Sequence, residues 1–510
     1  MKDNFYIGID LGTTYSCLAY IDETGNPIIE KNFEQEDTTP SVVLFDENRE
    51  MIVGSPAKDM AIMYPADRTF MSVKRQMGTD FKVNVDGEIY TPITLSAAIL
   101  KKMLNDFNEV HNCDVKRAVI TCPAYFGQKE RDSTKYAGKI AGLDEVIIIN
   151  EPTAAAISFG YGSDGSKKRI MVYDLGGGTF DVTILEIEGN TFNAVATDGE
   201  GLLGGKDWDI ALASLIKDKI SQSSNISIEE IEDDENAFAT LNIDTESIKK
   251  RLTTAESTRG SMSVSGERTV YTISRKEFES VTAPLLNRTL EIIGNVLDSK
   301  DFIMDDIDEI VLVGGSCRMP QIKGGILNKY PDAKVRLFDP DQSIAKGAAI
   351  FSRSKSLREI ESSEHSVNIK NVLSKTFGIR VNYGDKNMIS NLIYRNETLP
   401  IESVKIYNPM EKGQPSVLIE IFEDSAQRSD NTPRTDLIDG AYVGAFDMDL
   451  PPGIDMNTPI TVKFKALEDG TITAEVECMN EVKEYDLKNS LNISESDMKE
   501  SQGLIEKMSN

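Results

Sequence analysis

A short motif occurs twice in the chain, and this duplication constrains the fold more than any other feature of the sequence. Residues 7–14 read IGIDLGTT, and residues 171–179 read MVYDLGGGT. In each copy an apolar run leads to an aspartate, Asp10 or Asp174, and then to a glycine-containing turn that ends in threonine. A second apolar run follows each turn, which is typical of a β-hairpin. Because the copies are a domain's length apart, the duplication predicts two α/β lobes that face each other.

The chain has 510 residues, more than the roughly 250–300 at which a single hydrophobic core stops growing. Helical patterns at residues 95–110 and 128–141 alternate with the strands, so we expect residues 1–353 to form the α/β domain. A third strand-turn-helix pattern, IVLVGGSCRMP, starts at residue 310. The α/β domain is therefore expected to close near Arg353.

The composition changes after this domain. Residues 354–377 are polar and charged, as in a connector between domains. Residues 378–490 show alternating apolar positions, which predict an antiparallel β domain. Ser494 and Asp497 fit a capping box, so residues 491–510 are expected to hold a short helix or tail.

The overall composition excludes several classes of function. A formal charge of −28 opposes the phosphate neutralisation on which nucleic-acid binding depends. No apolar run approaches the ~18–20 residues of a membrane helix. The five cysteines form no C-x-x-C pair, and the chain starts without a leader pattern, so we expect a reducing, cytoplasmic location. With two histidines in all, a site would depend on oxygen ligands and lysine.

The repeated turns themselves indicate a ligand. Glycine lets backbone N–H groups approach an anion closely, and an aspartate at a strand end can hold magnesium through water. Asp10 and Asp174 therefore predict a phosphate and Mg²⁺ site. Taken alone, one such turn would more often be an ordinary strand end, but two copies make that interpretation much weaker.

Four other segments allow two interpretations each. Lys74 could meet a transferring phosphoryl group, although on its own a surface position is favoured. Glu151 could act in a site or simply be a favourable charge at a helix N-terminus, and the two interpretations are equal. Glu246, Lys249, Lys250 and Thr253 share one helical face. This face could receive a nucleoside, or it could be an exposed face with salt bridges. Gly314, Gly315, Ser316 and Arg318 lie in one turn. This turn could pack on adenine, or it could merely reverse the chain.

Seven segments together resemble one known family. They are IGIDLGTTYSCLAY, TCPAYFGQKER, IINEPTAAAI, VYDLGGGTFDVTIL, LLGGKDWD, IVLVGGSCRMP and DPDQSIAKGAA. In this order they resemble the seventy-kilodalton heat-shock (DnaK-type) chaperones over nearly the whole chain. The resemblance implies an α/β two-lobed actin-like ATPase domain, followed by an antiparallel β-sandwich that binds extended apolar peptides and by a short C-terminal helix. It also implies an ATP-dependent chaperone of the stress response.

The resemblance also assigns expected roles to residues. Catalytic positions are Lys74, Glu151, Asp174 and Thr179, and metal positions, mostly through water, are Asp10, Asp174, Asp181 and Glu151. Nucleotide positions are Asp10, Gly12, Thr13, Thr14, Tyr15, Gly176, Gly177, Gly178, Thr179, Gly204, Gly205, Glu246, Lys249, Lys250, Thr253, Gly314, Gly315, Ser316, Arg318 and Asp341. Pro123 and Arg131 match positions that relay the nucleotide state between domains, and Val417 matches a peptide-pocket position. Implied cofactors are ATP or ADP, Mg²⁺ and K⁺. Implied partners are unfolded polypeptides, a J-domain co-chaperone and a nucleotide exchange factor, but neither nucleic acid nor membrane.

Three departures from the family pattern matter. The family's leucine-rich connector is replaced by VNIKN at residues 367–371, which leads us to expect weaker docking, since each lost apolar side chain forfeits roughly 1.5–3 kcal/mol of burial. The peptide-arch loop near residues 382–388 matches poorly. The long helical lid has no counterpart in this sequence, which fits either a short-form member or a shortened sequence, and faster peptide release is expected without a lid.

Two rival functions and one charge-based hypothesis accompany this interpretation. A small-molecule kinase of the same nucleotide fold would consume ATP only with an acceptor, and a filament-forming scaffold would polymerise with ATP. The β-rich C-terminal third argues against both. Residues 366–510 hold 15 Lys and Arg against 24 Asp and Glu, so peptides with basic flanks should be favoured at low salt.

Overall fold

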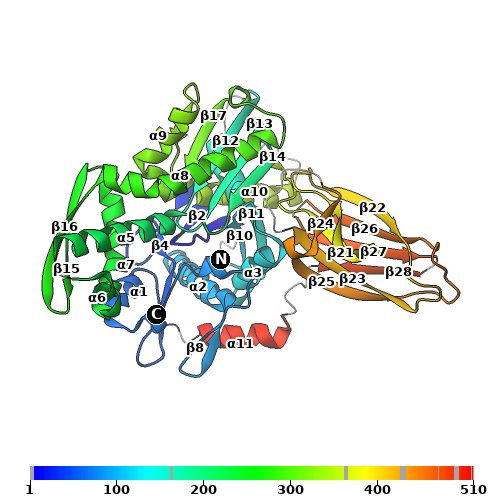
Figure 1. Ribbon diagram of the computed structural model, residues 1–510, viewed down its shortest axis with the longest axis horizontal. Helices are drawn as coiled ribbons and strands as arrows, with labels where there is room; N and C mark the ends of the chain where they lie inside the picture. Colours follow the sequence, from blue (N-terminus) through cyan, green and yellow to red (C-terminus); the bar gives the residue numbers. More distant parts are fainter. Residues whose placement is uncertain are drawn as a thin grey trace.

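The computed structural model describes residues 5–160, 165–224, 226–360, 366–424, 432–468, 470–479, 481–487, 493–506 and 508. Two α/β lobes stand next to a β-sandwich, and a C-terminal helix returns to the first lobe (Figure 1). The predicted fold class is therefore confirmed.

The first lobe is built on a mixed sheet with the strand order β11-β10-β1-β2-β3. Its strands are β1 (Ile7–Asp10), β2 (Tyr15–Ile21), β3 (Pro27–Ile29), β10 (Arg117–Cys122) and β11 (Glu145–Asn150). The remaining elements are β4 (Thr39–Pro40), β5 (Val42–Phe45), β6 (Met51–Val53), β7 (Thr69–Met71), β8 (Val83–Val85), β9 (Glu88–Tyr90), α1 (Ser55–Met60), α2 (Pro92–His111), α3 (Gln128–Ile140) and α4 (Glu151–Gly160).

The second lobe repeats this order as β18-β17-β12-β13-β14, with the same parallel and antiparallel pairings. Its strands are β12 (Lys168–Leu175), β13 (Phe180–Glu188), β14 (Thr191–Glu200), β17 (Glu309–Val313) and β18 (Val335–Leu337). The other elements are α5 (Gly205–Ser223), α6 (Ile228–Asp233), α7 (Glu235–Leu252), β15 (Ser257–Val264), β16 (Glu267–Ser274), α8 (Arg275–Asp298), α9 (Pro320–Lys329) and α10 (Ser343–Ile360). The duplicated motif thus reflects a duplicated lobe.

Helices α4 and α10 lie between the two sheets, where α10 packs closely against both α4 and β1. A Cβ on Gly8 of β1 would lie 2.1 Å from the backbone N of Ala349, and one on Gly347 would lie 1.8 Å from the carbonyl O of Ala154. Buried side chains from α4, α10 and both sheets form one cluster there. Helix α10 continues to Ile360, so residues 354–360, expected in the connector, extend the last helix of the α/β domain.

The connector docks on the second lobe. Strand β19 (Asn368–Lys370) pairs in parallel with β14 and extends its sheet. Val367 is fully buried and Ile369 partly buried, whereas the polar side chains of Asn368 and Lys370 point to solvent. Because strand side chains alternate between the two faces, the polar residues replace no buried contact. The two polar residues of the connector thus occupy exposed positions of the strand, and weaker docking stays a prediction.

The β domain is a sandwich of two antiparallel sheets, ordered β24-β21-β20-β23-β25 and β22-β26-β27-β28. Its strands are β20 (Phe377–Tyr383), β21 (Lys386–Ile393), β22 (Ile401–Tyr407), β23 (Ser416–Asp424), β24 (Arg434–Asp436), β25 (Gly440–Asp449), β26 (Ile460–Ala466), β27 (Ile472–Cys478) and β28 (Glu481–Asp486). Ile379 and Ile421 of the first sheet pack against Val462 and Phe464 of the second.

Helix α11 (Glu495–Ile505) begins at the predicted capping box of Ser494 and Asp497. It lies against the first lobe, on the side of α2 and α3 (Figure 1). Ile505 is fully buried in the core of that lobe. In the parts of the chain that the structure describes, no helix combines the length and apolarity needed to cross a bilayer.

Candidate functional site

The two glycine-containing turns of the repeat meet between the lobes. A Cβ on Gly177 would lie 1.9 Å from Oγ1 of Thr14, and one on Gly178 would lie 2.3 Å from Cγ2 of Thr13. Only glycine permits so close an approach. The motifs at Asp10 and Asp174 thus belong to one site.

A cleft of about 560 Å³ opens at this point, within the range of small-molecule sites. Most of the residues predicted to bind nucleotide line it, together with the predicted catalytic residues Lys74, Glu151 and Asp174. The nucleotide positions among them are Asp10, Gly12, Thr13, Thr14, Tyr15, Gly176, Gly177, Thr179, Glu246, Lys249, Lys250, Thr253, Gly314, Gly315, Ser316, Arg318 and Asp341. Three predicted glycines do not line the cleft directly: Gly178 packs against the side chain of Thr13, Gly204 against the backbone of Gly178 and Thr179, and Gly205 against Ser316. Asp181 is buried and does not line the cleft, but it is paired with Asp174 in the β12–β13 ladder.

Lys74 is placed in the cleft by a 3₁₀ turn, Val73–Gln76. It forms an ion pair with Glu151, the first residue of α4, and both side chains are almost fully buried. Burial alone would lower the pKa of Lys74, but the negative charges of Glu151 and Asp10 raise it. The ammonium therefore stays charged at neutral pH and can stabilise charge that develops on a transferred phosphoryl group.

The carboxylates near Lys74 outnumber the cations. Burial, followed by the charge of Glu151, raises the pKa of Asp10 to about 7, despite opposing effects of Lys74 and a hydrogen bond from Thr121. Burial, again reinforced by Glu151, holds the pKa values of Asp174 and Asp181 well above the usual range. A bound cation would offset this excess of negative charge.

The residues present suit magnesium held mainly through water. Within the described residues, Oδ2 of Asp174 and Oδ2 of Asp181 are buried without a hydrogen-bond partner. No three His, Cys, Asp or Glu side chains in the described ranges are placed to ligate one metal together. Mg²⁺ prefers oxygen and usually keeps several waters, so an unpaired carboxylate oxygen fits it.

The two lobes are joined across the cleft by Tyr15, Lys58, Glu246 and Lys250. The hydroxyl of Tyr15 donates to Oε1 of Glu246 at 3.1 Å and accepts from Nζ of Lys58 at 2.7 Å. Nζ of Lys58 lies 2.7 Å from Oε2 of Glu246, and Nζ of Lys250 lies 2.8 Å from Oε1. Burial of Glu246 would raise its pKa, but the two lysines lower it to about 2. The predicted helical face thus points into the cleft.

The turn that follows β17 closes the far side of the cleft. Oγ of Ser316 donates to the carbonyl of Gly176 at 2.8 Å, and Arg318 forms an ion pair with Asp341. Nζ of Lys249 lies 2.8 Å from Oδ1 of Asp209. The planar guanidinium and the adjacent glycine backbone can stack on an aromatic base.

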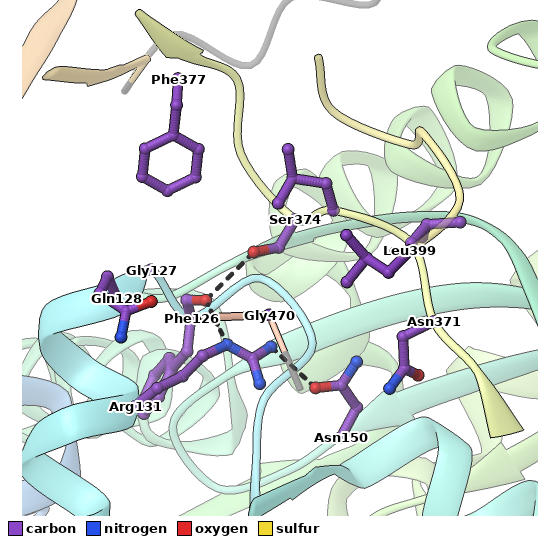
Figure 2. A pocket seen from close by; sticks show the side chains of 12 residues that line it. Phe126, Gly127, Gln128, Arg131, Asn150, Asn371, Ser374, Phe377, Leu399 and Gly470 are labelled. Atoms are coloured by element: carbon purple, nitrogen blue, oxygen red, sulfur yellow. Dashed lines mark hydrogen bonds between the residues drawn. The ribbon is translucent and has the colours of Figure 1, made fainter. Parts of the chain in front are cut away.

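Arg131 lies beside Asn371 and Ser374, and the carbonyl of Pro123 accepts from the backbone N of Phe126 at 3.3 Å in the turn before α3. Arg131 donates to the carbonyl oxygen of Phe126, and it donates to Oδ1 of Asn150 at 2.7 Å (Figure 2). It also donates to the carbonyl oxygen of Ala124. Asn150 directly precedes Glu151, the partner of Lys74. Arg131 therefore touches both the turn that starts at Pro123 and the strand that leads to the cleft.

The β domain contacts both lobes. Oγ of Ser374 donates to the carbonyl of Phe126 in the first lobe at 3.2 Å (Figure 2). Arg395 forms an ion pair with Asp198 of the second lobe, and Asn396 Oδ1 accepts from the backbone N of Thr197 at 2.9 Å. None of these contacts has a signal in the sequence, because they depend on how the domains meet.

The predicted peptide-binding features lie at the other end of the sandwich sheet. Val417, in β23, is half-buried against the sandwich core and pairs with Met448. The segment near residues 382–388 forms the turn between β20 and β21, where Nδ2 of Asn382 lies 3.0 Å from Sδ of Met410.

The sequence did not identify several other residues that line the cleft, including Lys58, Lys206, Asp209 and Gln342. Lys58 belongs to a helix of six residues, α1, and no motif marks it. Only the folded arrangement brings it opposite Glu246.

Comparisons with known proteins agree with this architecture. A family model described as "Hsp70 protein" matches residues 6–85 and 79–510. The chain is similar to the "Chaperone protein DnaK" of Thermosipho melanesiensis, with 37% identity over 481 residues, 92% of this chain and 78% of that protein. It is also similar to the proteins of that name from Thermotoga petrophila, 36% identical over 95% of this chain and 80% of the relative, and Thermotoga neapolitana, 36% identical over 98% and 83%. With the duplicated lobes, the interlobe cleft and the docked β-sandwich, these matches show that the chain belongs to the Hsp70 family.

Proposed function

We propose that the chain is an ATP-dependent chaperone that hydrolyses ATP to ADP and phosphate between its lobes and thereby changes the grip of its β domain on extended polypeptides. The observation that carries this proposal is the buried Lys74–Glu151 pair, which lies beside Asp10 and Asp174 in a nucleotide-sized cleft. Hydrolysis of this kind depends on positioning and charge stabilisation more than on covalent chemistry.

In the proposed reaction, the turn of Thr13 and Thr14 and the turn of Gly176 and Gly177 hold the phosphates between them. Lys74 stabilises charge on the γ-phosphate, and Glu151 keeps its ammonium in place. Bound Mg²⁺ would neutralise phosphate charge, and its water shell would lie against Asp10, Asp174, Asp181 and Glu151; K⁺ is a further proposed cofactor. Asp174 and Thr179 would orient the attacking water.

The proposed adenosine pocket comprises Glu246, Lys249, Lys250, Thr253, Gly314, Gly315, Ser316, Arg318 and Asp341. The nucleotide state would reach the β domain through Pro123 and Arg131, because Arg131 bonds both the turn that Ser374 contacts and the residue before Glu151. Positioning chemistry is slow without a partner that completes the geometry, so a J-domain protein and a nucleotide exchange factor are proposed partners. A cytoplasmic location and the preference for basic peptide flanks stay predictions.

One experiment tests the coupling that this function requires. Release of a labelled apolar peptide is measured with ATP, with ADP and without nucleotide. Faster release with ATP supports the proposal. Equal rates in all three conditions would mean that the ATPase and the peptide binder merely share a chain. ATP consumption that needs a small-molecule acceptor would instead indicate a kinase.

A further inference from the structure

Helix α3 starts at the interface with the β domain without a cap of its own. Its N-cap residue is Gly127, which has no side chain to accept a hydrogen bond from the first turn. The first N–H groups of a helix need an acceptor from outside the helix, and a carboxylate also interacts favourably with the positive end of the helix dipole.

The acceptor comes from the β domain. The carboxylate of Glu423, in β23, accepts a hydrogen bond from the backbone N–H of Gln128. A Cβ on Gly127 would lie 2.5 and 2.6 Å from the two carboxylate oxygens of Glu423, so an N-cap with a side chain would collide with it. Glycine at the N-cap thus makes room for a cap supplied by another domain.

The other side of the same turn faces the nucleotide cleft. Nζ of Lys74 lies 5.9 Å from the centre of the Phe126 ring, and the backbone N of Tyr125 lies 3.3 Å from Oδ1 of Asp181. In the first turn of α3, Glu130 packs on Gly78, where a Cβ would lie 2.9 Å from Cγ of Glu130. Gly78 closely follows the 3₁₀ turn that carries Lys74. Residues 123–130 therefore touch Glu423 on one side and the Lys74 region on the other.

We propose that Glu423 is the N-terminal cap of α3 across the domain interface and a positioning residue for Lys74, acting through residues 123–130. The catalytic part of this inference rests on the ATPase function proposed above. The docking part does not, because the cap is a contact between two domains that exists without nucleotide.

The cap also makes docking depend on pH. Glu423 faces Glu130 and Lys129 of α3 and Lys375 of the segment before β20, and Lys129 lies near the ring of Tyr442 in β25. Burial, followed by the charge of Glu130, raises the pKa of Glu423 to about 7, although Lys375, the Gln128 N–H and Lys129 oppose the shift. Undocking would expose the carboxyl and return its pKa to about 4.3. The docked state thus binds more protons, so docking is strongest below that value and weakens as pH rises to about 7.

The docking part is tested by proteolysis of the connector in the full chain without nucleotide. Thermolysin digestion between residues 367 and 373 is measured from pH 5 to pH 8 for the wild type and for Glu423→Gln. Glutamine keeps an acceptor for Gln128 but does not titrate. Because both proteins meet the same protease at each pH, the ratio of their cleavage rates removes the protease's own pH dependence.

The expected ratio of wild-type to Glu423→Gln cleavage rises at least tenfold between pH 5 and pH 7.5 and is constant above that. Glu420→Gln, on the same strand but paired with Arg380 inside the β domain, should follow the wild-type profile. A ratio that does not change with pH, or an equal change in Glu420→Gln, would overturn the proposal.

The catalytic part is tested by steady-state ATP hydrolysis of Glu423→Ala and Glu423→Gln at pH 6, with thermal unfolding to confirm that both variants are folded. Glu423→Ala should change kcat at least threefold with KM within twofold, because the turn facing Lys74 loses its fixed position. Glu423→Gln should restore the wild-type kcat. An unchanged kcat in Glu423→Ala would remove Glu423 from catalysis. Absence of ATP hydrolysis in the wild type would reject the proposed function while leaving the proteolysis result intact.

Discussion

Nζ of Lys58 lies 2.7 Å from Oε2 of Glu246, and this ion pair joins α1 of the first lobe to α7 of the second. The hydroxyl of Tyr15 is bonded to both partners. Both residues line the cleft in which we propose that nucleotide binds, so the pair should influence how fast a nucleotide leaves.

Replacing Lys58 with alanine should speed nucleotide release. A partly buried pair of this kind contributes about 1 kcal/mol, which corresponds to a roughly fivefold faster dissociation. Stopped-flow measurement with a fluorescent ATP analogue checks this, and Lys82→Ala, at an exposed position of the same lobe, is the control. An unchanged rate would show that the pair does not hold the lobes together.

The ionisation of the Lys58–Glu246 pair determines how its effect on nucleotide dissociation depends on pH. The folded pKa of Glu246 is lowered to about 2, so its stabilising effect is complete above about pH 4.5 and is lost as pH falls toward 2. The ratio of the nucleotide dissociation rates of Lys58→Ala and the wild type should therefore be constant between pH 5 and pH 8. A ratio that drifts across this range would contradict the assignment of the ionised pair.

Lys74→Ala should keep ATP binding but lose on the order of 10²–10³ in turnover, the typical loss for one preorganised donor. The variant removes the cation that we propose faces the γ-phosphate and leaves the proposed adenosine side of the cleft intact. Calorimetry measures binding and single-turnover hydrolysis measures the chemical step, again with Lys82→Ala as the control. Turnover like that of the wild type would remove Lys74 from the mechanism.

The alternation of buried and exposed residues in the connector can be tested with two variants that introduce the same charge at neighbouring positions. Val367→Asp places a charge at a fully buried position, so β19 should detach and proteolysis of the connector should accelerate at least tenfold. Asn368→Asp adds the same charge at an exposed position and should leave proteolysis within twofold. Equal acceleration by both variants would reject the described orientation of the strand.

The contact of α11 with the first lobe predicts a further effect. Ile505→Ala removes a fully buried side chain, a change that costs about 2–5 kcal/mol where the helix stays docked, and less if the helix detaches. Hydrogen exchange of residues 495–505 should therefore become faster, whereas Lys499→Ala, on the exposed side of α11, should not change it. Protection equal to the wild type in both variants would show that this contact is not maintained in solution.

The duplicated lobes and most of the cleft could be predicted because local sequence determines them. The strands that end near Asp10 and Asp174 are built from contiguous residues, and two equivalent hairpins have few ways to meet. The helical face of Glu246 and Lys250 was read from spacing, but only the position of α7 across the cleft distinguishes a binding face from an exposed one.

Contacts between distant segments could not be predicted. Neither Lys58 opposite Glu246 nor Glu423 at the start of α3 belongs to a motif, because each depends on the packing of separate parts. The expectation of weaker docking by residues 367–371 stays a prediction, but it did not consider how a strand alternates. It counted apolar residues, whereas the docked strand buries only every second side chain, and those positions hold Val367 and Ile369.

The β domain is attached to the first lobe through Ser374 and Glu423 and to the second lobe through β19 and Arg395. A rigid domain that is bound to both lobes limits how far the lobes can rotate relative to each other. If closing the cleft turns one lobe relative to the other, at least one of the two attachments must slide or break. The position of the sandwich would then depend on the angle between the lobes, in addition to the contacts that Arg131 makes.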